Sequence, residues 1–164
     1  MENIIKSVTA QALGVYEDEV KIDYRLMGGM SNLMYVIEIR GEKYTFRIPG
    51  KNAEMFVNRE EELANIEIVD ELKLNNEMIY FDTQTGYKIS KFVEGTPLSE
   101  VENPEPYLEE VAKVLHVLHE SGLNAHDDYR PYDRLTAYEK LVTDFSYQHE
   151  KKYFTLKELF LSQR

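Results

Sequence analysis

The chain has 164 residues, of which 43% are hydrophobic and 30% charged, a composition that supports one folded core. Its formal net charge of −11 argues against a nucleic-acid or anionic-membrane partner, because both surfaces need clustered Lys and Arg. The absence of cysteine excludes disulfides and favours a cytoplasmic setting, and no stretch approaches the ~18 apolar residues of a membrane span.

The first part of the chain predicts one helix and three strands. Apolar residues at helical spacing indicate the helix, and Gly14 is a natural stop. We expect Gly41-Glu42 to form a two-residue hairpin between the second and third strands. In chain order, the expected elements are a helix over 2–13, strands over 20–27 and 33–40 joined through GGMSN, and a strand over 43–50.

The remainder predicts a helix, two more strands and then helices only. Asn58 is the expected start of the first of these helices, because three glutamates follow it where the helix dipole favours acids. The later elements are strands over 77–82 and 87–93, a helix over 104–122, a helix near 133–148 and a helix starting at Thr155.

This order predicts an α+β fold of a specific kind. A five-stranded antiparallel sheet with one helix inserted between its third and fourth strands is the small lobe of a protein-kinase-like fold. We therefore predict a nucleotide-binding small lobe over residues 1–94, and the first helices of an α-helical large lobe over 95–164. A nucleoside triphosphate needs free backbone N–H groups and a fixed cation, which a glycine turn and a basic third strand supply.

Five segments carry a family resemblance. LMGGMSNLMY, YTFRIPG, NREEELAN, YFDTQTGYKISKFVEG and VLHVLHESG resemble, in this order, the bacterial choline kinase family. That family is part of the wider choline/ethanolamine kinase and aminoglycoside phosphotransferase superfamily. The resemblance implies magnesium-dependent transfer of the ATP γ-phosphate to the hydroxyl of choline or a similar amino alcohol. The residues do not distinguish choline from ethanolamine or another acceptor.

The resemblance also implies a set of nucleotide-binding residues. The glycine turn would cover the nucleotide, and Arg47 would contact phosphate. Glu62 would pair with Arg47, with Glu61 as the nearest competitor. The strand end at 91–93 would hold the adenine through its backbone. The implied site is Gly28, Gly29, Ser31, Asn32, Arg47, Glu62, Lys91, Phe92 and Val93. Taken singly, a Gly-Gly turn, one strand arginine and a glutamate run are typical of ordinary surfaces.

The catalytic and magnesium-binding acids of the family are expected beyond Arg164, so we expect this chain alone to be inactive. Two stretches imitate kinase signatures: HDDYRPYD, with His126 and Asp128, and TDFSYQ, around Asp144. We interpret both as chance likenesses, because the supporting catalytic context is missing. His116 and His119 have no third ligand nearby, so we expect no zinc site.

The last helix predicts an uncovered apolar face formed by Leu156, Leu159, Phe160 and Leu161. We therefore expect the N-terminal part of a longer kinase, with self-association through these helices as a further expectation. Three rival hypotheses stay open. One is a non-catalytic kinase-like binding module, and the second is an aminoglycoside-type phosphotransferase fragment. The third is a complete minimal kinase that uses Asp128 and Asp144.

Overall fold

The computed structural model describes residues 1–27, 31–128, 130–142 and 150–163. Contacts divide the chain into two compact units, Met1–His126 and Asp127–Arg164. Gly28, Gly29 and Asp144 lie outside the described residues. The functional boundary that the sequence places near residue 94 is a different kind of division, and it stays a prediction.

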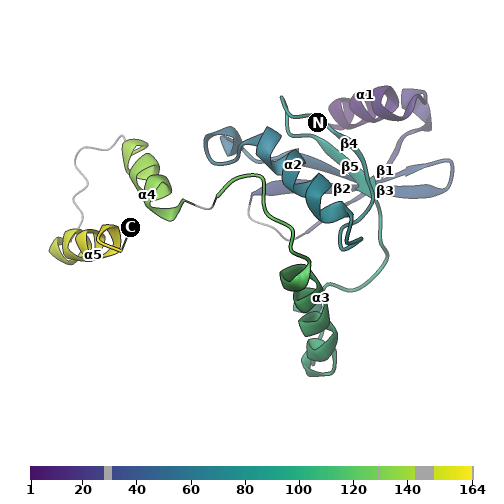
Figure 1. Ribbon diagram of the computed structural model, residues 1–164. Helices are drawn as coiled ribbons and strands as arrows, with labels where there is room; N and C mark the ends of the chain where they lie inside the picture. Colours follow the sequence, from purple (N-terminus) through teal and green to yellow (C-terminus); the bar gives the residue numbers. More distant parts are fainter. Residues whose placement is uncertain (28–30, 129, 143–149, 164) are drawn as a thin grey trace. The chain divides into compact units, whose positions relative to one another are not determined.

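Within the described residues, five strands form one antiparallel sheet in the spatial order β1-β2-β3-β5-β4 (Figure 1). The strands are β1 (Lys21–Leu26), β2 (Asn32–Ile39), β3 (Glu42–Pro49), β4 (Met78–Phe81) and β5 (Lys88–Lys91). Helix α1 (Glu2–Leu13) precedes the sheet, and helix α2 (Arg59–Asp70) lies between β3 and β4 in the chain. The predicted α+β lobe with one inserted helix is confirmed.

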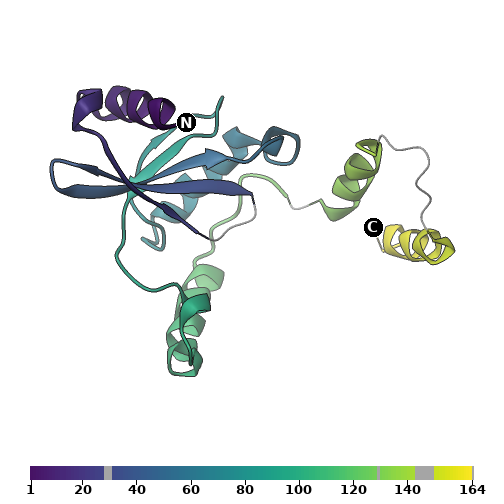
Figure 2. The same ribbon diagram turned by 180° about the vertical axis from the view of Figure 1, so that it is seen from behind.

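The apolar core lies between α1 and one face of the sheet. Ile5 of α1 packs with Phe46 of β3 and Ile89 of β5, and all three side chains are 0% exposed. Because side chains alternate along a strand, Arg47 and Lys88 lie on the opposite face. That second face is the one that α2 covers, as the two views from opposite sides show (Figures 1 and 2).

Helix α2 begins where the sequence indicates. The Asn58 side chain accepts hydrogen bonds from the backbone N–H groups of Glu60 (3.0 Å) and Glu61 (3.4 Å), which satisfies two of the donors that a helix start leaves unpaired. The first turn of the helix is acidic, as the helix dipole favours. Glu62 lies in this first turn, and its backbone N–H donates to the Asn58 carbonyl oxygen at 3.0 Å.

The hairpin between β2 and β3 differs from the expectation. Ile39 pairs with Glu42, so the two central residues are Arg40 and Gly41 rather than Gly41 and Glu42. Their φ angles are 53° and 85°, the conformation of a type I′ turn, whose twist suits a two-residue hairpin. The Arg40 side chain donates hydrogen bonds to Glu19 at 2.7 and 3.1 Å.

The helices after the sheet are α3 (Leu108–Glu120), α4 (Pro131–Lys140) and α5 (Lys151–Leu161), and α5 begins before the expected Thr155. Short 3₁₀ turns lie at Glu17–Glu19, Ala53–Met55, Leu98–Glu100 and Glu105–Tyr107. In the second unit, α5 packs against α4: the rings of Phe160 and Tyr132 lie 4.5 Å apart, and Glu139 accepts hydrogen bonds from Tyr153 and Lys157. Phe160 therefore contacts α4, although 39% of it stays exposed, whereas Leu156 and Leu159 are 52% and 60% exposed.

Candidate functional site

Arg47 lies on β3, and only 7% of it is exposed. Its Nη1 donates to Oε1 of Glu62, and its Nη2 donates to Oε2 of the same carboxylate at 3.3 Å. The competitor Glu61 instead accepts a hydrogen bond from Asn58 at 2.7 Å. The sheet and α2 are thus joined by a two-bonded arginine–glutamate pair, and Glu62 is its acidic member.

Two further groups hold the Arg47 guanidinium. The carbonyl oxygen of Gly86 accepts from Nη2 at 3.0 Å and from Nε at 3.3 Å. The Arg47 guanidinium also lies over the Phe81 ring, with Cζ 5.3 Å from the ring centroid. The hydrogen bonds to Glu62 and Gly86 engage four of the five N–H groups of the side chain. Arg47 therefore has one donor left for a ligand.

Glu62 also binds a second arginine. Arg59, whose side chain is 10% exposed, donates from Nη1 to Oε2 of Glu62 at 2.6 Å. Burial by itself raises the pKa of the Glu62 carboxyl, but the hydrogen bonds and charges of Arg47 and Arg59 outweigh it, so the net pKa lies below its usual value. This carboxylate is therefore ionised at neutral pH and faces two arginines.

A third cation, Lys88, was not among the predicted site residues. It lies directly opposite Arg47 in the β3–β5 ladder and is half-buried. The signal was available, because Ile89 is the apolar residue of this strand and Lys88 must therefore point away from it. The pKa of Lys88 is lowered, chiefly by burial and to a smaller extent by the positive charge of Arg47. The negative charge of Glu62 acts in the opposite direction and raises this pKa. Three cations around one carboxylate suit the binding of an anion such as a polyphosphate.

The end of the expected nucleotide turn is fixed to the end of β3. The backbone N–H of Gly50 donates to the carbonyl oxygen of Ser31 at 2.7 Å, and Asn32 pairs with Pro49. A Cβ atom added to Gly50 would lie 2.3 Å from that oxygen, so the close approach requires glycine. Ser31 and Asn32 are therefore held beside the strand that carries Arg47.

The segment expected to hold adenine continues from β5. Lys91 N–H donates to the Glu77 carbonyl at 2.9 Å, and Phe92 N–H donates to the Lys43 carbonyl at 3.1 Å. The Lys91 side chain lies over the Tyr44 ring at 4.6 Å and binds Glu42. Lys91 and Phe92 are thus tied to the sheet, whereas Val93 is 62% exposed.

The remaining candidates that the structure describes are His116, His119 and Asp128. His116 and His119 are both exposed on α3. In the part of the chain that the structure describes, no three His, Asp or Glu side chains gather in a way that could hold a metal ion. The backbone N–H of Asp128 donates to the Asp127 side chain at 2.9 Å. None of the described helices is long and apolar enough to cross a membrane.

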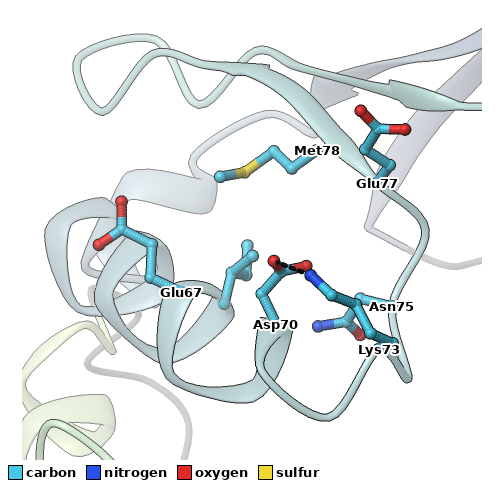
Figure 3. Close-up of a pocket in the computed structure, with 7 residues that line it drawn as sticks. Glu67, Asp70, Lys73, Asn75, Glu77 and Met78 are labelled. Atoms are coloured by element: carbon cyan, nitrogen blue, oxygen red, sulfur yellow. Dashed lines mark hydrogen bonds and ion pairs between the residues drawn. The ribbon is translucent and has the colours of Figure 1, made fainter.

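A cavity of about 410 Å³ lies at the C-terminal end of α2 (Figure 3). Its lining is Ile66, Glu67, Asp70, Lys73, Asn75, Glu77 and Met78, none of which is a predicted site residue. Lys73 spans part of it and binds Asp70 at 3.0 Å (Figure 3). The cavity is thus separate from the Arg47 cluster, which comprises Arg47, Arg59, Glu62, Gly86 and Lys88.

Comparison with known proteins decides the family. A family model described as choline/ethanolamine kinase matches residues 24–161. The chain belongs to the choline/ethanolamine kinase family. Among curated members, a Protein LicA of Haemophilus influenzae is 28% identical over 143 residues, which are 85% of this chain and 42% of that protein. A second Haemophilus influenzae LicA is 27% identical over 80% of this chain and 51% of its own length.

Solved structures of the family share the fold. The crystal structure of choline kinase LicA from Streptococcus pneumoniae superposes with a TM-score of 0.78 at 23% identity, over 99% of this chain and 55% of that one. LicA in complex with AMP gives a TM-score of 0.74, also at 23% identity and over the same shares. A choline/ethanolamine kinase family protein from Mesorhizobium loti gives 0.61 at 20% identity, over 94% of this chain and 50% of that one. The chain therefore spans about half the length of the relatives that it matches.

Proposed function

We propose that this chain is the nucleotide-binding part of an ATP-dependent kinase that phosphorylates choline or a related amino alcohol. The observation that carries the proposal is the pair between Arg47 of β3 and Glu62 of α2, inside a sheet of kinase-like order. Family membership and the AMP complex of a family member support it.

Each part of the site has a proposed role. Gly28, Gly29, Ser31 and Asn32 would cover the phosphates, and Arg47 would bind a phosphate oxygen through its remaining N–H group. Glu62 would hold Arg47 in place. The backbone of Lys91, Phe92 and Val93 would bind adenine. In the described residues, Val93 N–H has no hydrogen-bond partner, so it is the donor that we assign to the base.

The transfer step needs groups that the described residues do not provide. ATP supplies the phosphoryl group, and magnesium would act on it in the complete enzyme. Because the described residues gather no metal ligands, we derive no step through the metal. The catalytic and magnesium-binding acids are still predicted beyond Arg164, and the choline-like acceptor and a cytoplasmic location also stay predictions.

Calorimetric titration with ATP tests the proposal. We expect weak binding that magnesium barely changes, because we predict that a large lobe beyond these residues completes the slot that encloses adenine, and the described residues gather no metal ligands. Arg47→Met should weaken ATP binding, whereas Arg47→Lys, which keeps the charge, should retain part of it. We expect no choline-dependent ADP formation by this chain. Micromolar affinity that magnesium sharpens would show a complete site and contradict this assignment.

Self-association is a secondary proposal. Apolar side chains of two helices are about half exposed or more. In α3 these are Val114, Leu115 and Val117, at 47–49%, and in α5 they are Leu156 at 52% and Leu159 at 60%. Such faces favour burial against another protein surface. Sedimentation velocity over a range of concentrations tests this, and a monomer at all of them would contradict it.

A further inference from the structure

The Arg47 cluster contains more positive charge than its one carboxylate can neutralise. Arg47 and Arg59 both bind Glu62, and Lys88 lies across the ladder from Arg47. Among the described residues, Lys88 makes no ion pair and no hydrogen bond through its ammonium group. The cluster thus holds one carboxylate and three cations, of which Lys88 is the unpaired one.

The location of Lys88 makes an unpaired charge costly. Its neighbours Ile89 and Ser90 are 0% and 5% exposed, and Lys88 itself is half-buried on the face that α2 covers. Partial burial removes water from the ammonium group, and Arg47 repels it. An anion placed beside Lys88 would relieve both effects.

The hydrogen bonding of Arg47 points the same way. Four of its five N–H groups are already engaged by Glu62 and Gly86, so Arg47 mainly joins α2 to the sheet. A lysine ammonium has three N–H donors, and those of Lys88 are all available within the described structure. Lys88 is therefore better supplied with free donors than the arginine beside it.

We propose that Lys88 is a second phosphate-binding residue, which acts together with Arg47 on the polyphosphate tail of a nucleoside triphosphate. The proposal rests on the proposed function and extends it to a residue from β5. Arg47 and Lys88 are paired residues of β3 and β5, so their side chains leave the same face of the sheet. A triphosphate has several charged oxygens and can therefore bind both cations, which a single carboxylate does less well.

Lys88→Met tests this by comparing ligands with and without phosphate. Loss of a charge-assisted contact should lower ATP affinity by roughly 10- to 100-fold. Adenosine affinity should not change, whereas a merely structural role for Lys88 would lower both. Tripolyphosphate should bind the wild type and lose affinity in the variant. Lys88→Arg should restore most of the ATP affinity, because it restores the positive charge.

A matched control removes an equal charge elsewhere. Lys113 of α3 is exposed and binds Glu109 and Glu110, so Lys113→Met should leave ATP affinity unchanged. If Lys88→Met binds ATP as the wild type does while Arg47→Met does not, the inference about Lys88 is wrong and the proposed function stands. If the wild type binds neither ATP nor tripolyphosphate, both are wrong.

Discussion

The carbonyl oxygen of Gly86 accepts two hydrogen bonds from Arg47, at 3.0 and 3.3 Å. Gly86 belongs to the turn between β4 and β5, and Asp82 begins this turn by binding Gln84 N–H at 2.9 Å and Thr85 Oγ1 at 2.5 Å. The Arg47 guanidinium is therefore positioned by a backbone group as well as by Glu62. The orientation of the Arg47 guanidinium therefore depends on the conformation of a turn that contains none of the predicted site residues.

Gly86→Ala should destabilise the protein. Gly86 has a φ of +73°, and an added Cβ would lie 2.7 Å from both Arg59 Nε and Pro49 Cγ. We expect a loss of about 2–3 kcal/mol in the free energy of unfolding, from backbone strain plus displacement of Arg59. Gly14→Ala is the matched control, because Gly14 has a φ of +67° and nothing within 4 Å. Urea denaturation measures both, and equal losses would show that the packing around Gly86 contributes nothing.

Glu62→Gln should also destabilise the protein, by about 2 kcal/mol, because two poorly exposed arginines would lose their shared carboxylate. The control is Glu61→Gln at the neighbouring position, because the Glu61 carboxylate binds only Asn58 among the described side chains. We expect that change to stay within about 0.5 kcal/mol. Chemical denaturation of both variants at neutral pH compares them. A larger loss for Glu61→Gln would reverse the assignment of the acidic partner.

The lowered pKa of Glu62 predicts a pH dependence of stability. A carboxyl group whose pKa is lower in the folded than in the unfolded state stabilises the fold above its unfolded pKa, and this contribution is lost as the pH falls through the folded pKa. The stability difference between wild type and Glu62→Gln should therefore be largest above the ordinary value of 4.5 and shrink below it. Denaturation curves at a series of pH values measure this difference. A gap that widens on acidification would contradict the ionised pair.

Gly50→Ala should disturb the end of the nucleotide turn. The new Cβ would lie 2.3 Å from the Ser31 carbonyl oxygen, and backbone atoms cannot move aside as a flexible side chain can. We expect large amide shifts at Ser31 and Asn32 in ¹H–¹⁵N spectra and weaker ATP binding. Gly95→Ala, which meets nothing within 4 Å, should leave those amides in place. Unchanged Ser31 and Asn32 signals in Gly50→Ala would show that this contact does not constrain the turn.

Much of this structure could be predicted from local patterns. Alternation along β3 places Phe46 and Arg47 on opposite faces, and Asn58 followed by three acids marks the start of α2. The hairpin between β2 and β3 was predicted, but its turn residues were not, because the register depends on which residues of the two strands pair across the sheet. Alternation with Ile89 could have predicted the face on which Lys88 lies, but its position opposite Arg47 is a relation between two distant segments.

Titration of the ¹⁵N-labelled chain with ATP tests whether the glycine turn, the Arg47 cluster and the end of β5 form one nucleotide site. We expect shifts at Ser31, Asn32 and Val93 and at the side chains of Arg47 and Lys88. We expect no shifts at Ile5 and Thr9 of α1, which are buried on the opposite face of the sheet. Shifts confined to the residues of the cavity in Figure 3, or no shifts at any ATP concentration, would contradict this site.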